Sequence, residues 1–268
     1  MIRRHLCVLA VVGWIVSIVP ARALPVDLEL VLAVDVSGSI DAEEAQLQRE
    51  GYVQAFLDPI LIKTIIDGNH GRIAVAYIEW SGGEQQQVVM SWTLIKDAAS
   101  ARAFADELAK QPIARGRYTS ISGAIDFASP MFDANEYEST RQVIDVSGDG
   151  YNNSGRFILF ARDQAVAKRI TINGLPIVND RPNPFGGPNQ NRDLDVYYEN
   201  CVIGGQGAFM IVANGFKEFA TAVRRKLILE IAGVEPEPRV QPAQARLTDC
   251  LLGERQFRQF QFRTPDNQ

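Results

Sequence analysis

A short segment rich in oxygen donors follows an apolar stretch near the start of the chain. The segment Asp35-Val36-Ser37-Gly38-Ser39 supplies one carboxylate and two hydroxyls, and its glycine permits a tight turn. The donors are all oxygens, with no sulfur or imidazole among them, and such a set suits a hard divalent cation, Mg²⁺ or Mn²⁺. The segment therefore predicts a metal site. The alternative is a plain helix start, in which Ser39 or Asp41 caps the helix.

Two later segments offer further oxygen donors. Thr119 lies in a polar loop that precedes a helix-like stretch, and Asp149 follows a strand-like stretch. The carboxyl ends of parallel strands meet at one edge of a sheet, so these loops are expected to converge on the first segment. Asp145 competes with Asp149 as a ligand. Asp145 lies within the strand, where structural hydrogen bonds are expected, and Asp149 is the better placed of the two.

The elements that must position these donors alternate between strands and helices. An apolar run such as LELVLAVD is typical of a central strand that is buried on both faces. The alternation predicts an α/β fold with a doubly wound, mostly parallel six-stranded sheet. A Ser-Gly-Gly turn at residues 81–83 joins two strands as a hairpin, which gives one antiparallel edge strand. The expected strands are 28–35, 72–80, 86–92, 141–147, 170–178 and 208–213, and the expected helices are 41–57, 97–110, 121–132, 157–169 and 216–231. Pro59 is expected to end or kink the first helix.

The donor residues, in this order and at these intervals, resemble the metal-ion-dependent adhesion site of the von Willebrand factor A (VWA) domain family. The resemblance covers about residues 27–233 and implies a Rossmann-like VWA fold. It also implies that Ser37, Ser39 and Thr119 bind the metal directly, whereas Asp35 and Asp149 hold it mainly through water. The stretches IDVSGDGYNNSG, YYENCVIGG and FKEFATAVRRKLILEIAG further resemble an uncharacterised bacterial branch of exported VWA proteins, a domain of unknown function.

The loop before Thr119 departs from the glycine-rich form that is common in that family. It reads ARGRYTS, so Arg115 and Arg117 are expected to flank the site. Two arginines there would favour an acidic ligand. The alternative is that both are ordinary solvated surface charges.

The N-terminus has the order of a secretory signal peptide. A basic start is followed by an apolar run at residues 6–19 and by small residues around position 23. The alternative is an uncleaved anchor, although a mostly apolar run of 14 residues is shorter than the roughly 20 that span a bilayer. The predicted organisation is a signal peptide at 1–23, a VWA-like domain at 24–233 and a Pro-rich linker with a C-terminal tail at 234–268. The predicted location is periplasmic or secreted, with no stable membrane span after cleavage.

Three cysteines occur in the chain, and one of them, Cys7, lies in the predicted signal peptide. In an exported protein the remaining two, Cys201 and Cys250, are expected to form a disulfide. The alternative is a pair of free thiols. The aromatic residues Phe257, Phe260 and Phe262 offer a means of docking the tail onto the domain or a partner, and a loosely ordered terminus is the alternative.

Composition excludes several functions. The net charge of −5 argues against a nucleic-acid surface, and two histidines in the whole chain exclude a multi-His zinc site. The favoured hypothesis is a binding module whose metal takes an Asp or Glu of a protein or peptide partner. One alternative is a structural or assembly protein with a fold-stabilising metal site. The other is a metal-assisted hydrolase, but no Ser lies in a GxSxG elbow and His70 is distant in sequence from the carboxylates.

Overall fold

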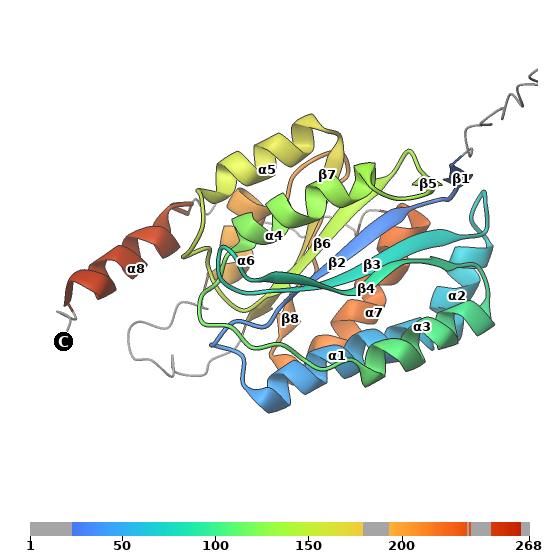
Figure 1. The fold of residues 1–268 in the computed structure, drawn as a ribbon, viewed down its shortest axis with the longest axis horizontal. Helices are drawn as coiled ribbons and strands as arrows, with labels where there is room; N and C mark the ends of the chain where they lie inside the picture. Colours follow the sequence, from blue (N-terminus) through green and yellow to red (C-terminus); the bar gives the residue numbers. More distant parts are fainter. Residues whose placement is uncertain (1–22, 179–192, 235, 237–247, 264–268) are drawn as a thin grey trace, which may run out of the picture.

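The computed structural model describes residues 23–178, 193–234, 236 and 248–263 (Figure 1). The predicted signal peptide therefore lies outside the described residues, except for its last residue. Parts of the predicted tail, including the side chains of Phe257, Phe260 and Phe262, also lie outside them. Among the described residues, no helix has both the length and the apolar character that crossing a membrane requires.

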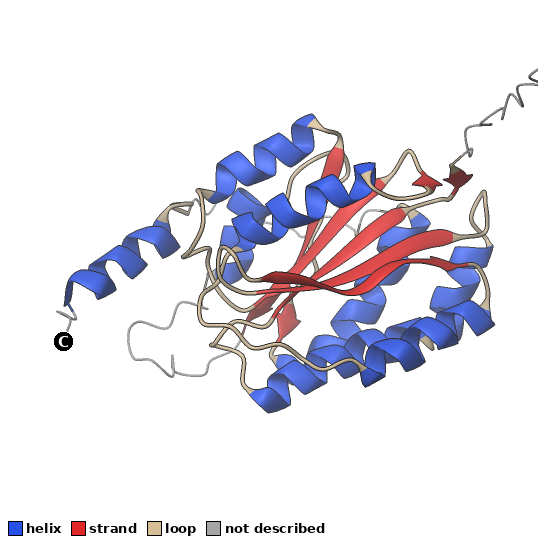
Figure 2. Ribbon diagram, viewed as in Figure 1, coloured by secondary structure: helices blue, strands red, loops and turns tan. Residues whose placement is uncertain are grey.

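The core of the molecule is a six-stranded sheet with the strand order β4-β3-β2-β6-β7-β8 (Figure 2). Every neighbouring pair is parallel except β3 and β4, which form the predicted antiparallel hairpin at one edge. The strands are β2 Glu29–Asp35, β3 Ile73–Trp80, β4 Gln86–Ile95, β6 Gln142–Gly148, β7 Ile170–Val178 and β8 Ala213–Asn214. A separate two-stranded sheet pairs β1 Leu24–Pro25 with β5 Tyr137–Glu138.

Strand β2 is central because its side chains face two hydrophobic cores. Leu30 and Leu32 belong to one core, and Val31 and Ala33 belong to the other. Successive side chains of a strand point to opposite faces, so an unbroken apolar run is what a strand covered on both faces requires. All seven residues of β2 are buried.

Helices cover both faces of the sheet, as a doubly wound fold requires (Figure 1). One face carries α1 Ala42–Phe56, α2 Pro59–Ile66, α3 Ala98–Lys110 and α7 Phe216–Ala232. The other carries α4 Ile121–Ala128, a 3₁₀ helix Ser129–Asp133, α5 Ile158–Ala167, α6 Leu194–Tyr197 and a π-helix Tyr198–Val202. A further helix, α8 Leu252–Arg263, follows in the C-terminal segment.

The structure differs from the sequence-based expectation in several elements: the expected helix 121–132 is divided into α4 and a 3₁₀ helix, and β1, β5, α6, the π-helix and α8 were not expected. Two further differences concern α2 and the sixth strand. Pro59 follows the first helix and is also the first residue of α2. Its missing N–H costs nothing at that position, because the first N–H groups of a helix have no partner within the helix. Asp58 caps α2 by accepting the backbone N–H of Ile60. The sixth strand is Ala213–Asn214 rather than 208–213. The backbone N–H of Phe209 donates to the side chain of Asn173 instead of to a strand, which interrupts regular pairing there.

A buried ionic cluster links α7 to the sheet. Lys226 is fully buried, and its Nζ lies 2.6 Å from Asp145 Oδ1 on β6 and 3.2 Å from Glu230 Oε1. Asn173 on β7 donates to the same Glu230 oxygen at 2.5 Å. Burial raises the pKa of Asp145 to about 7, while Lys226 acts in the opposite direction. The lysine is thus the only cation in contact with these two acidic groups among the described residues.

We expect Lys226→Met to lower the free energy of unfolding by about 3–5 kcal/mol, because it leaves buried acidic groups without their cation. Urea unfolding followed by circular dichroism measures the change. The matched control is Lys63→Met, which removes a lysine from an exposed pair with Asp67 and should leave the midpoint almost unchanged. A Lys226 variant with the midpoint of the wild type would contradict the assigned role.

Candidate metal centre

The predicted donor loops meet at the carboxyl edge of the sheet. Strands β2 and β6 are neighbours, so Asp35 at the end of β2 lies beside Asp149, which directly follows β6. The loop that carries Thr119 crosses the same edge. Its Gly116 N–H donates to the carbonyl of Val36 at 3.0 Å, which fixes the loop over the end of β2. The three donor segments therefore converge, as the sequence predicts.

The side-chain oxygens form one continuous hydrogen-bonded cluster. Ser39 Oγ donates to Asp149 Oδ1 at 2.6 Å and lies 3.2 Å from Ser37 Oγ. Thr119 Oγ1 lies 3.3 Å from Ser37 Oγ. Asp35 Oδ1 accepts the backbone N–H of Ser37 at 2.7 Å, which turns the carboxylate towards the loop. The structure therefore brings together all five residues that the sequence analysis named as metal ligands.

The cluster is buried on all sides but one. Asp35, Ser37, Thr119 and Asp149 are almost fully buried, whereas Ser39 is exposed. Ser39 does not cap the first helix. Asp41 does so, in a capping box with Glu44, which leaves the Ser39 hydroxyl for the cluster. Solvent thus reaches the donor set from the Ser39 side.

Both carboxylates are costly to ionise in this buried site. Burial, followed by the charge of Asp149, raises the pKa of Asp35 well above its usual range. Burial raises the pKa of Asp149 to about 6, although the Ser39 hydrogen bond opposes the shift. Asp35 Oδ2 is buried and has no hydrogen-bond partner among the described residues, and no described Lys or Arg forms an ion pair with either acid. Such a site is stabilised by a bound cation.

The donor set decides which cations fit. No group of three or more His, Cys, Asp or Glu side chains gathers as a metal cluster among the described residues. The cluster instead offers two carboxylates and three hydroxyls, all hard oxygen donors. Mg²⁺ and Mn²⁺ favour oxygen ligands and are commonly bound by one or two carboxylates. The residues present therefore fit a divalent cation of this type.

The sequence analysis also considered Asp145 as a metal ligand, and Arg115 and Arg117 as residues that flank the site. Asp145 points away from the cluster into the ionic contact with Lys226, as its place within a strand predicted. Arg115 and Arg117 are both exposed and flank Gly116, which is bonded to the loop of the donor segment. Their place at the rim of the site stays a prediction.

Two asparagines that the sequence reading did not assign to the site support its loops. Asn153 accepts the backbone N–H of Thr119 at 3.0 Å, and its own N–H donates to the carbonyl of Thr119. Asn152 is fully buried, and its side chain accepts the N–H of Ser122 and donates to Glu254. One feature of the sequence could have identified them, because the two adjacent asparagines follow the turn that contains Asp149.

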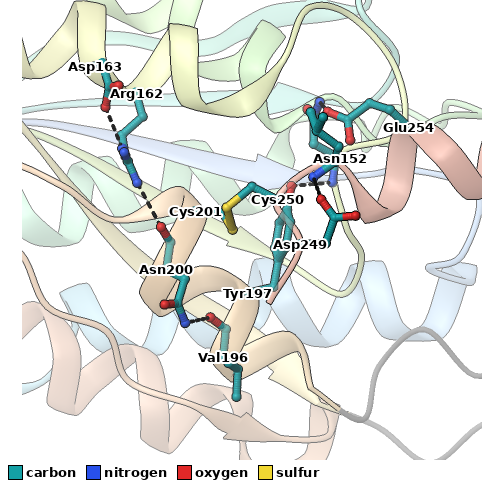
Figure 3. The surroundings of a disulfide bond; sticks show 11 residues. Asn152, Arg162, Asp163, Val196, Tyr197, Asn200, Cys201, Asp249, Cys250 and Glu254 are labelled. Carbon is teal, nitrogen blue, oxygen red and sulfur yellow. Dashed lines mark hydrogen bonds and ion pairs between the residues drawn. A yellow bond between two sulfur atoms is a disulfide. The ribbon is translucent and has the colours of Figure 1, made fainter. Parts of the chain in front are cut away.

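The predicted disulfide is present and lies close to this support. Cys201 and Cys250 are bonded, with their Cα atoms 5.5 Å apart. The side chain of Asn152 donates a hydrogen bond to Glu254 of α8, in the same C-terminal segment as Cys250 (Figure 3). Gly253 packs against the backbone of Asn152 so closely that a Cβ would lie 2.2 Å from the carbonyl oxygen. The C-terminal segment therefore contacts the loop that follows Asp149.

The chain has the α/β fold of VWA-type proteins. Similar solved structures include proximal thread matrix protein 1 from the mussel byssus, with a zinc-occupied MIDAS motif, at 13% identity and a TM-score of 0.51 over 77% of this chain and 46% of that one. The pilus adhesin SpaC from Lactobacillus rhamnosus GG, in an open conformation, matches at 13% identity and a TM-score of 0.55, over 78% and 31%. A von Willebrand factor type A protein from Catenulispora acidiphila matches at 15% identity and a TM-score of 0.50, over 77% and 43%.

The chain spans less than half the length of these solved proteins. No curated protein matches it. The chain belongs to the family described as "Protein of unknown function (DUF1194)", whose model matches residues 25–235.

We expect the double substitution Cys201→Ser with Cys250→Ser to lower the free energy of unfolding by about 2–4 kcal/mol, because it releases the constraint that the bond places on the unfolded chain. Denaturant unfolding measures the loss. Adding a reductant should lower the stability of the wild type to a similar extent and leave the double variant unchanged. The expectation is contradicted if the wild type keeps the same free energy of unfolding when it is unfolded and refolded in reductant.

Proposed function

We propose that the protein is an exported binding module whose metal-ion-dependent adhesion site holds Mg²⁺ or Mn²⁺ and captures an acidic group of a protein or peptide partner. The observation that carries the proposal is the pair of buried carboxylates, Asp35 and Asp149, without a protein cation beside them among the described residues. Three hydroxyls complete the set, and one of them, from Ser39, faces solvent.

Each donor has a distinct part in this proposal. Ser37, Ser39 and Thr119 provide the hydroxyls that bind the ion, and the two carboxylates neutralise its charge. A bound divalent cation supplies a Lewis-acidic position that a carboxylate of the partner can fill. Because Ser39 is the exposed member, the partner approaches from its side and passes the rim formed by Arg115 and Arg117.

The solved relatives support the class of site but not the particular ion. The mussel protein has a zinc-occupied MIDAS motif, and this supports a divalent ion at the corresponding place here. For this chain we favour Mg²⁺ or Mn²⁺, since its donors are all oxygens.

Export is supported by two features. The N-terminal residues have the order of a signal peptide, and a disulfide joins the only two cysteines beyond it. Disulfides persist outside the reducing cytoplasm. We propose a periplasmic or secreted location on this basis.

A hydrolase is less well supported by the placement of titratable groups. His70, the only histidine beyond the predicted signal peptide, donates its backbone N–H to Asp27 at the amino end of the sheet. That end lies opposite the carboxyl edge where Asp35 and Asp149 meet. A structural role for the metal is the other alternative, and it predicts partner binding that survives removal of the Thr119 hydroxyl.

Calorimetric titration of the metal-stripped protein with Mg²⁺ and Mn²⁺ should show one binding site. Asp35→Ala should abolish it, because that variant loses a charge that neutralises the cation. Asp67→Ala is the matched control, since it removes an exposed carboxylate at the end of α2 and should bind as the wild type does. Equal binding by both variants would place the metal elsewhere.

The rim can be tested with peptides that each carry one central Glu, compared with the same peptides carrying Gln. Binding should require both Mg²⁺ and the Glu. Reversing the rim charges with Arg115→Glu and Arg117→Glu should weaken binding about three- to tenfold and reduce its salt dependence, without changing Mg²⁺ affinity. Arg102→Glu, on the exposed surface of α3, is the control. Peptide binding that persists in EDTA would contradict the proposal.

A further inference from the structure

Tyr198 places a buried phenol against Gly148, the residue before Asp149. The residue is fully buried in the π-helix that follows α6, and its hydroxyl has no hydrogen-bond partner among the described residues. A buried hydroxyl left without a partner costs about 1–3 kcal/mol, so native structures rarely keep one. The position therefore calls for an acceptor close by.

Asp35 of the metal site also has a buried oxygen, Oδ2, that lacks a hydrogen-bond partner among the described residues. Both oxygens lie against Gly148, at the end of β6, where a Cβ would stand 2.9 Å from Asp35 Oδ2 and 3.1 Å from the Tyr198 hydroxyl. The two oxygens are consequently no more than about 6 Å apart, within reach of one bridging water. The absence of a side chain at Gly148 leaves their approach open.

We infer that the Tyr198 hydroxyl is linked to Asp35 Oδ2 through one bridging water, to which it donates a hydrogen bond, and so orients the carboxylate for the cation. The inference rests on the metal site proposed above. It makes Tyr198 a positioning residue that does not itself bind the metal. The two oxygens of Asp35 would then be fixed from opposite sides, Oδ1 by the N–H of Ser37 and Oδ2 by the phenol through the water.

The chemistry of the phenol agrees with this role. Burial, followed by the charge of Asp35, raises the pKa of Tyr198 well above its usual value, so the group keeps its proton and remains a donor. Carboxylates that face metals are commonly held by such outer hydrogen bonds, and their loss typically lowers metal affinity by about 10- to 100-fold.

The local backbone explains how Tyr198 reaches the site. It opens a π-helix, an insertion in helical geometry that often occurs at functional sites. Cys201 in the same π-helix is bonded to Cys250, and Arg162 of α5 donates to the carbonyl of Asn200 at 2.9 Å (Figure 3). These contacts hold the segment in place beside β7, where a Cβ on Gly174 would lie 2.7 Å from the Tyr198 ring.

The test combines metal binding with a measurement that needs no metal. We expect Tyr198→Phe to weaken Mg²⁺ binding about tenfold by calorimetry. It should also remove the tyrosine difference absorption that Mg²⁺ induces in the wild type. In the metal-free protein, a double-mutant cycle in urea should show that Tyr198→Phe and Asp35→Ala are not additive, because each removes one end of the same water-mediated link.

Tyr52→Phe is the matched control. Tyr52 is equally buried, but its hydroxyl lies on the other face of the sheet and donates to Ser147 Oγ. It should keep the Mg²⁺ affinity of the wild type and should be additive with Asp35→Ala. The inference is overturned if Tyr198→Phe binds Mg²⁺ as the wild type does, or if its cycle with Asp35→Ala is additive.

Failure of the proposed function is distinguishable from failure of this inference. A wild type that binds neither Mg²⁺ nor Mn²⁺ makes the proposed function wrong. The metal-free cycle then decides by itself whether Tyr198 is linked to Asp35. A non-additive cycle supports the link in that case, and an additive one overturns it.

Discussion

Two carboxylates are confined together at the ends of adjacent parallel strands, and much of the surrounding structure follows from this confinement. The parallel register of β2 and β6 sets Asp35 beside the residue that follows Gly148. Helices on both faces keep water away, so the repulsion between the acids is poorly screened. Hydroxyls, a backbone N–H and the loop of Thr119 oppose that repulsion only in part.

Elsewhere in the molecule, buried acids are compensated from within the chain. Glu79 forms an ion pair with Arg49, and Asp145 forms one with Lys226. Glu29 accepts hydrogen bonds from amide side chains instead. The cluster at the carboxyl edge differs from these sites because the described chain brings no cation to it. Under the proposed function, that contrast separates acids that serve the fold from acids that bind a ligand.

The sequence specifies this site more fully than it specifies the support around it. The donor residues precede or follow apolar strands in a fixed order, and the parallel topology then brings them together. Lys226 lies in a helix whose pattern places charged residues outside, so its burial depends on Asp145 of β6, an acid that no local pattern reveals. The contribution of Asn152 likewise depends on Glu254, a residue 102 positions away. The start of α2 was missed because a proline ends one helix and opens another equally well.

The bond between Cys201 and Cys250 has a topological consequence. It encloses α7 and the stretch that leads to α8 in a covalent ring. A protease that cuts the backbone once inside this ring produces two fragments that remain joined through sulfur. The C-terminal helix then stays attached, with Glu254 against Asn152, until a reductant opens the bond. In an oxidising environment, a single cut in this part of the chain therefore leaves the molecule in one piece, and the cleavage becomes visible only after reduction.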